Sequence, residues 1–264
     1  MNKTTVRAAL LASALATAVA VPVTAQAQSA SGYANGYATT NLRVDGAPLL
    51  KSFYFRYENE DHHLAGVEVQ PHSPALGRLS LMFQDDNGDD RYFYNVQFSP
   101  YYGEIFRRNH PREYCTDTCT VPVAAPPNLQ DYVFVITGFY IYYRGGDHHI
   151  DEIRITEDSG KVTVAFNDQN DDDPFAWDLQ YAYVPRSRFT ALDARSGTAA
   201  GAAEAPIENG NAVVRGFAFN FASDDHHIKD FGVWMGYAGK LQVYYGDKNP
   251  TDKFRWVVDY GIVN

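Results

Sequence analysis

Three stretches of the chain carry one pattern that decides the fold: FYFRYENEDHHL at 53–64, FYIYYRGGDHHI at 139–150 and FAFNFASDDHHI at 217–228. Each stretch opens with a phenylalanine, continues as an aromatic run and reaches the triplet Asp-His-His eight residues later, followed by an aliphatic residue. A pattern that recurs along one chain marks an internal repeat, which has to be recognised before any single motif is interpreted. We therefore treat the chain as three copies of one unit.

Each copy is predicted to contain four β-strands. The aromatic run alternates and is bounded by turn residues, as strands are. The second strand begins at the triplet, and its apolar residues, spaced by three and then two, predict a β-bulge or bend beside the histidine pair. A short apolar third strand and a fourth strand with aromatic residues at every second position follow, at 79–83 and 92–98 in the first copy. Spacing by two places those aromatic residues on one face of a sheet.

The sequence therefore predicts an all-β fold of three tandem four-stranded antiparallel repeats. Such a unit cannot bury both faces of its sheet alone, so the copies should pack together. They would do so with pseudo-threefold symmetry, as in β-prism or trefoil-like folds, or as consecutive small sandwiches, and the shared aromatic faces favour the threefold form. In organisation alone, this layout resembles secreted β-rich lectins with threefold internal symmetry.

The boundaries follow from composition. The repeats are predicted at 47–100, 132–185 and 212–264, joined by connectors at 101–131 and 186–211. The connectors are rich in proline or in Ala, Gly and Ser without helical periodicity, which predicts irregular segments. The leader at 28–46 is expected to be loose or an added edge strand.

Residues 1–27 are predicted to be a Sec-type signal peptide. Lys3 and Arg7 precede an apolar, alanine-rich stretch, and Ala25-Gln26-Ala27 fits the small-x-small pattern of a cleavage site. The alternative is an uncleaved anchor. The mature chain is expected in the periplasm or outside the cell, and it has no later run of about eighteen apolar residues that could span a membrane.

The chain is acidic. Its formal net charge is −10, and loss of Lys3 and Arg7 makes it two units more negative. Such a surface repels nucleic acid and anionic membranes and favours cations and neutral ligands, so no nucleic-acid partner is expected. Aromatic residues make up 14% of the chain, which is too many core-forming residues for a disordered protein.

Cys115 and Cys119 are the two cysteines of the chain. In an oxidising compartment, a local disulfide is the expected state of such a pair. A redox-active pair would favour the spacing C-x-x-C at the start of a helix, and no helix signal follows here.

The Asp-His-His triplets have three interpretations. As turn residues, the aspartates would hydrogen-bond their own backbone and the histidines would fill space beside the bulge. As ligand-binding residues, they would bind sugar hydroxyls at three exposed loops, with Tyr57, Tyr143 and Phe221 available to stack on the sugar. As metal ligands, one histidine from each copy (His63, His149 and His227) would converge on a zinc or copper ion. Adjacent strand residues point to opposite faces, so two histidines of one triplet are not expected to bind the same ion. The candidate ligand-binding residues are Asp61, His62, His63, Asp147, His148, His149, Asp225, His226 and His227.

A second repeated motif, Asp-x-Asn-x-x-Asp, lies between the third and fourth strands. Oxygen ligands at alternate loop positions are typical of calcium sites, although no EF-hand spacing is present. The same residues are also what a turn between strands selects. The candidate metal ligands are Asp85, Asn87, Asp90, Asp168, Asn170, Asp173, Asp247, Asn249 and Asp252.

The function expected from these features is non-enzymatic, lectin-like binding of carbohydrate or another neutral surface ligand, with calcium as the assisting ion. No nucleophile elbow, H-E-x-x-H motif or glycine-rich phosphate loop is present, and a triplicated polar set favours binding over a single active site. The alternative is a structural or envelope-assembly protein in which both motifs only shape turns. A metal-dependent enzyme is the third interpretation.

Overall fold

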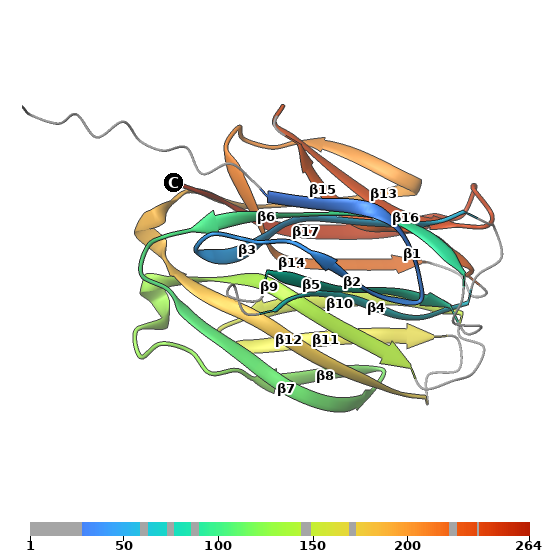
Figure 1. Ribbon diagram of the computed structural model, residues 1–264, viewed down its shortest axis with the longest axis horizontal. Coiled ribbons are helices and arrows are strands. Elements are labelled where there is room, and N and C mark those ends of the chain that lie inside the picture. The colour runs from blue at the N-terminus through green and yellow to red at the C-terminus, as the bar shows by residue number, and fades with distance from the viewer. Residues whose placement is uncertain are drawn as a thin grey trace, which may run out of the picture.

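The computed structural model of the protein, shown in Figure 1, has an all-β fold. The structure describes residues 28–58, 63–72, 77–85, 90–143, 149–168, 173–221, 226–236 and 238–264. They form seventeen strands and two short 3-10 helices. The strands make an eleven-stranded and a six-stranded sheet, and the pairings are antiparallel. Within the described ranges, no helix has the length and apolar character needed to cross a membrane.

The elements follow the three copies along the chain. The first copy and its leader contain β1 (Gln28–Asn35), β2 (Tyr37–Asn41), β3 (Ala47–Tyr57), β4 (Leu64–Pro71), β5 (Arg78–Asp85) and β6 (Arg91–Tyr101). The second contains β7 (Phe106–Thr116), β8 (Thr118–Pro122), η1 (Leu129–Asp131), β9 (Tyr132–Tyr143), β10 (Ile150–Asp158), β11 (Lys161–Asp168) and β12 (Pro174–Pro185). The third contains η2 (Arg186–Arg188), β13 (Phe189–Pro206), β14 (Asn211–Phe221), β15 (Ile228–Gly236), β16 (Lys240–Asp247) and β17 (Lys253–Val263).

The strands of one copy are shared between neighbours. The first strand of each copy pairs with its own fourth strand and with the second strand of a different copy. Thus β3 pairs with β15, β9 with β4, and β14 with β10. The third copy thereby closes back on the first, and the blue N-terminal and red C-terminal strands lie together in Figure 1. A copy is therefore not a four-stranded sheet of its own, because its first strand completes the sheet of another copy.

The predicted bulge beside the histidine pair is present in all three copies. One extra residue interrupts the pairing just after each triplet: Ala65 in β4, Asp151 in β10 and Lys229 in β15. The bulge explains why the apolar spacing departs from strict alternation, since the extra residue shifts the later side chains to the other face.

The prediction of irregular connectors is wrong. β7 and β8 pair with β12 and β11, and the two halves of β13 pair with β17 and β16. The leader strands β1 and β2 do the same for β6 and β5, as the alternative of an added edge strand expected. These strands are half exposed and carry few large apolar residues, but their backbone groups satisfy the open edges of the inner strands.

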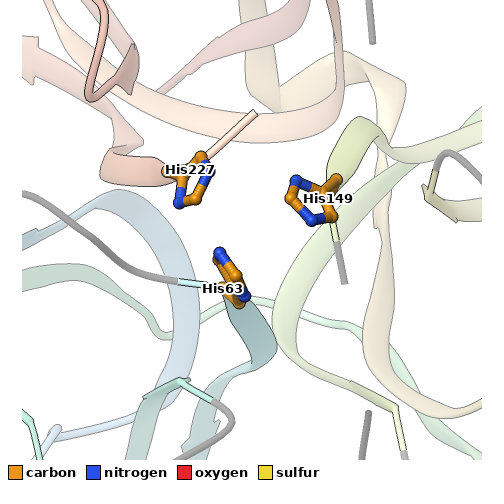
Figure 2. A group of neighbouring side chains, drawn as sticks. All are labelled: His63, His149 and His227. Carbon is orange, nitrogen blue, oxygen red and sulfur yellow. The ribbon is translucent and has the colours of Figure 1, made fainter. Parts of the chain in front are cut away.

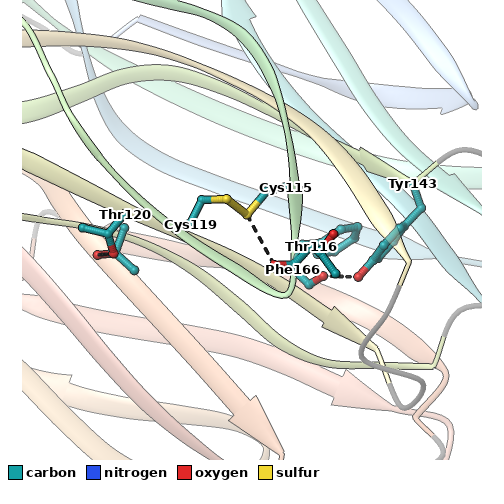
Figure 3. Close-up of a disulfide and its surroundings, with 7 residues drawn as sticks. Cys115, Thr116, Cys119, Thr120, Tyr143 and Phe166 are labelled. Atoms are coloured by element: carbon teal, nitrogen blue, oxygen red, sulfur yellow. Dashed lines mark hydrogen bonds between the residues drawn. A yellow bond between two sulfur atoms is a disulfide. The ribbon is translucent and has the colours of Figure 1, made fainter.

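Each edge segment bends where it passes from the fourth strand of its copy to the third. The bend residues have left-handed backbones: Gly36 (φ 50°), Asp117 (φ 56°) and Gly201 (φ 70°). Glycine adopts this conformation without strain, and aspartate tolerates it. The predicted disulfide between Cys115 and Cys119 brackets Asp117, with its Cα atoms 5.9 Å apart (Figure 3). It therefore fixes the one bend of the three that has no glycine.

The centre of the core is a contact among the three phenylalanines that open the repeated stretches. The ring centroids of Phe53, Phe139 and Phe217 lie 5.2–5.5 Å from one another, in edge-on or tilted pairs. All three side chains are fully buried. Aromatic pairs of this geometry add about 0.5–1.5 kcal/mol each beyond the area they bury. This phenylalanine trio holds the three first strands against one another.

We expect Phe139→Ala to destabilise the protein by about 3–5 kcal/mol, because it removes a fully buried ring and leaves a cavity between the copies. Urea unfolding of the variant and of the unmodified protein measures the change. Tyr102→Ala is the control, since Tyr102 is 66% exposed, and it should change stability by less than about 0.5 kcal/mol. Equal losses in both variants would contradict a central role for the phenylalanine trio.

Candidate metal centre at the three histidines

The second histidines of the three triplets come together in space. Figure 2 shows the rings of His63, His149 and His227, here called the histidine trio, pointing toward one another from three separate parts of the chain. Their ring centroids are 4.3 Å, 4.7 Å and 5.2 Å apart. One nitrogen of each ring lies within 4.8 Å of the others, and all three side chains are half-buried. This is the arrangement that the metal-ligand interpretation required.

The strand pairing places these histidines. Each one immediately precedes the second strand of its copy, where the bulge begins. The next residue pairs with an aspartate at the end of the third strand: Leu64 with Asp85, Ile150 with Asp168, and Ile228 with Asp247. Each second strand lies beside the first strand of another copy, and the three first strands meet at the phenylalanine trio. The starts of the three second strands, where the histidines lie, are therefore close to one another.

In the third copy, Asp247 holds the backbone of the triplet directly. The N–H of His227 donates a hydrogen bond to Oδ1 of Asp247, at 2.8 Å. The carbonyl of His227 accepts from the N–H of Lys248, at 3.0 Å. The N–H and the carbonyl of His227 are thus both held by the adjacent residues Asp247 and Lys248, which limits where its ring can point.

The first histidine of this triplet has a different environment. His226 is fully buried and its ring stacks on Phe221, with centroids 3.8 Å apart. Its Nδ1 lies 3.2 Å from Oδ2 of Asp247 and 3.9 Å from Oδ2 of Asp252. The two adjacent histidines therefore point to opposite sides, as expected for neighbouring residues of an extended chain.

The acidic motif lies partly in the core rather than in an open loop. Asp85, Asp168 and Asp247 are all buried, whereas Asp90 is half-buried and Asp173 is exposed. In the third copy, Asn249 bonds through its side chain to Asp252 and accepts from Thr251, at 3.1 Å and 2.9 Å. These contacts fit the turn interpretation of this loop, and calcium binding stays a prediction.

The pKa values of Asp247 and Asp252 in the third acidic motif are shifted in opposite directions. Burial acts to raise the pKa of Asp247, but hydrogen bonds from His226 and from the backbone of His227 outweigh it and hold that pKa below its usual value. Partial burial and the neighbouring Asp247 carboxylate raise the pKa of Asp252. The Asp247 carboxylate is therefore stabilised in its charged form, while the charge of Asp252 is disfavoured.

The histidine trio fits a transition-metal ion. Three imidazoles are a competent zinc or copper ligand set with one position left for water or another ligand. Bonds of 2.0–2.1 Å to a tetrahedral ion would bring the nitrogens to about 3.3 Å from one another. Because the three nitrogens already lie within 4.8 Å, modest rotations of the rings would complete such a site.

The remaining predicted residues are distributed as follows. Asp61, His62, Asn87, Asp147, His148, Asn170 and Asp225 lie outside the described residues. The aromatic residues considered for stacking on a sugar, Tyr57, Tyr143 and Phe221, are at most 3% exposed and belong to the core. Their rings therefore expose too little surface for a sugar to stack on them.

The sequence did not reveal a pair of acidic residues on the six-stranded sheet, the buried Glu68 and the half-buried Asp178. Arg112 pairs with Asp178 at 3.0 Å and stacks on Tyr140, and Gln70 bonds to the same aspartate. Glu68 is 6% exposed, and burial followed by the charge of Asp178 raises its pKa to about 7, against the opposing effect of Arg112. Glu68 of β4 and Asp178 of β12 pair with Tyr140 of β9 from its two sides, so only the strand pairing shows that the two acidic residues lie on one face of the sheet.

This raised pKa predicts a pH-dependent stability. A carboxyl group whose pKa rises from 4.5 to about 7 on folding favours the folded state below pH 4.5, and this contribution is lost as the pH rises through 7. Glu68→Gln cannot ionise, so its stability relative to the unmodified protein should increase by up to about 3 kcal/mol between pH 5 and pH 8. Thermal melts across this range measure the change.

The exposed Glu208 provides the control, because Glu208→Gln should leave the pH dependence unaltered. Parallel curves of melting temperature against pH for Glu68→Gln and the unmodified protein would contradict the raised pKa of Glu68.

Comparison with known proteins assigns no family. No protein-family model matches the chain, and no curated protein matches it. One solved structure that aligns with it is the major capsid protein P2 from bacteriophage PM2, at 10% identity over 89% of this chain and 98% of that chain. The TM-score of that alignment is 0.18, which carries no argument about fold or function.

Proposed function

We propose that this is an exported, non-enzymatic metal-binding protein, which holds a divalent transition-metal ion with His63, His149 and His227. The observation that carries the proposal is the convergence of three histidines, one from each copy, to within 4.8 Å. Three imidazoles brought together from segments far apart in sequence are a metal-ligand set, whereas turn residues would not need to meet.

We also propose that the three copies are arranged about a pseudo-threefold axis that passes through the histidine trio and the phenylalanine trio. The cyclic pairing of first and second strands between copies supports this arrangement. Consecutive sandwiches would instead pair these strands within one copy. A second cluster of equivalent apolar residues, Leu49, Val135 and Val213, also brings the three first strands together.

Charge and access favour a cation at this position. The chain has a formal net charge of −10, which attracts cations to its surface. The three imidazoles are half-buried rather than sealed, so an ion could reach them and keep one position for a small ligand. Imidazole ligands suit zinc and copper better than calcium or magnesium, so zinc is the first ion to test.

Thermal melts with and without zinc test this proposal. An ion that binds only the folded protein stabilises it by about 2.7 kcal/mol at a hundred times its Kd, which is a readily measured shift in melting temperature. We expect this shift with the unmodified protein and its loss in the triple variant His63→Gln, His149→Gln, His227→Gln.

His72→Gln is the matched control, because His72 is exposed and bonds to Ser80 at 2.6 Å, away from the histidine trio. It should keep the zinc-dependent shift. A triple variant that retains the full shift would place zinc elsewhere and overturn the proposal.

Carbohydrate binding is the second candidate function, and an aromatic groove favours it. The groove, of about 570 Å³, is lined by Tyr33, Tyr54, Arg56, Tyr57, Glu58 and Phe93. Tyr33 is 55% exposed and packs against Phe93 at 5.5 Å, and the hydroxyl of Tyr54 donates to Asp230 at 2.7 Å. Aromatic rings flanked by charged hydrogen-bonding groups suit a sugar, which has an apolar face and a rim of hydroxyls.

A screen of immobilised neutral glycans tests this second function. We expect Tyr33→Ala to weaken binding of any captured glycan by up to about tenfold, because it removes the exposed ring of the groove. Tyr102→Ala removes a comparably exposed tyrosine outside the groove and should bind as the unmodified protein does. Binding that is equal in all three proteins would exclude the groove as the site.

A further inference from the structure

The buried His226 belongs to a second group of possible metal ligands, separate from the histidine trio. His226, Asp247 and Asp252, here called the His226 cluster, each offer one nitrogen or oxygen atom, and these atoms lie within 4.8 Å of one another. Nδ1 of His226 is 3.2 Å from Asp247 and 3.9 Å from Asp252. The nearer separation matches the distance of about 3 Å between neighbouring ligands of one octahedral ion, and the farther one exceeds it by less than about 1 Å.

The outer atoms of the cluster are held by other groups, and the inner atoms contact one another, since Nδ1 of His226 hydrogen-bonds to Oδ2 of Asp247 at 3.2 Å. Oδ1 of Asp247 accepts the N–H of His227, and Oδ1 of Asp252 accepts from Asn249. The stacking of His226 on Phe221 fixes the plane of its ring. Hydrogen bonds that orient ligands from behind are typical of metal sites. Contacts within the protein therefore already orient the three ligand groups of the cluster.

Electrostatics favour a cation among these atoms. The ligand oxygens of two carboxylates lie within 4.8 Å of each other beside His226, and Asp247, whose side chain is 3% exposed, has little water to screen its charge. Like charges that share a site disfavour each other's ionisation, and an opposite charge between them relieves this cost. Asp252 is 28% exposed, so the cluster has an opening to solvent on its side.

We propose that His226, Asp247 and Asp252 form a second site, which binds a divalent first-row ion such as Mn²⁺. Two carboxylate oxygens and one imidazole nitrogen form a mixed set that suits such an ion. Calcium takes six to eight oxygen ligands, so a nitrogen at one of three protein positions makes calcium the less suitable occupant. Asp247 would join the two sites, because it holds the backbone of His227 while its other oxygen faces the ion.

The internal repeat gives independent support. Asp85 and Asp168 occupy the same register as Asp247 and are likewise buried, at 2% and 1% exposure. The motif that contains these aspartates is retained in all three copies, although most other residues of the copies differ. Burial of a carboxylate costs free energy, so a carboxylate kept at the same register in every copy indicates a role that the three copies share.

Mn²⁺ binding to the full chain tests the site, with the free ion followed by its electron paramagnetic resonance signal. The background is the triple variant His63→Gln, His149→Gln, His227→Gln, which removes the histidine trio. We expect Mn²⁺ to bind in this background, and Asp252→Asn to weaken binding of one ion by about tenfold or more. Asp252 is chosen because it is partly exposed, whereas replacement of the buried His226 would also disturb the core.

Asp45→Asn is the matched control, since Asp45 is a surface aspartate paired with Arg43, and it should leave Mn²⁺ binding unchanged. Without metal, Asp252→Asn and the background protein should melt at similar temperatures. Undiminished Mn²⁺ binding in Asp252→Asn, no Mn²⁺ binding in the background, or binding of calcium alone would each overturn the second site. Because the histidine trio is absent from these proteins, none of these results bears on its zinc binding.

Discussion

The contact among Phe53, Phe139 and Phe217 determines how the three copies pack together. It brings the first strands of the three copies against one another, so each can pair with the second strand of another copy. Because every second strand starts at an Asp-His-His triplet, the same contact also determines where the triplets lie. Packing of three apolar rings thereby positions a polar site made from three distant parts of the chain.

The two histidines of one triplet lie in different environments because neighbouring residues of an extended chain point in opposite directions. In the third copy, His227 faces the histidine trio and His226 faces the buried Asp247. Asp247 contacts both, through the N–H of His227 and the ring of His226. The two histidines and the following acidic motif thus form one connected unit, although they are separated by a full strand pair in sequence.

The sequence predicted the all-β class, the bulge and the disulfide, because these depend on local pattern. It did not predict β7, β8 and β13, because edge strands with one solvent-exposed face need no hydrophobic pattern, and backbone pairing alone holds them. The sequence also did not predict that first strands pair with second strands of other copies. Repeated copies have equivalent strands, so a first strand could pair equally well within its own copy or with another. For the same reason, the meeting of His63, His149 and His227 remained one of three interpretations until the pairing was known.

Three copies of one unit bring their second histidines together, and we propose that these histidines bind one ion. Anomalous X-ray diffraction at the zinc edge, from crystals grown with zinc, tests this most directly. We expect an anomalous peak that locates a zinc ion at about 2.0–2.1 Å from one nitrogen each of His63, His149 and His227. Imidazoles that point apart, or a well-ordered trio with zinc bound only at other residues, would contradict it.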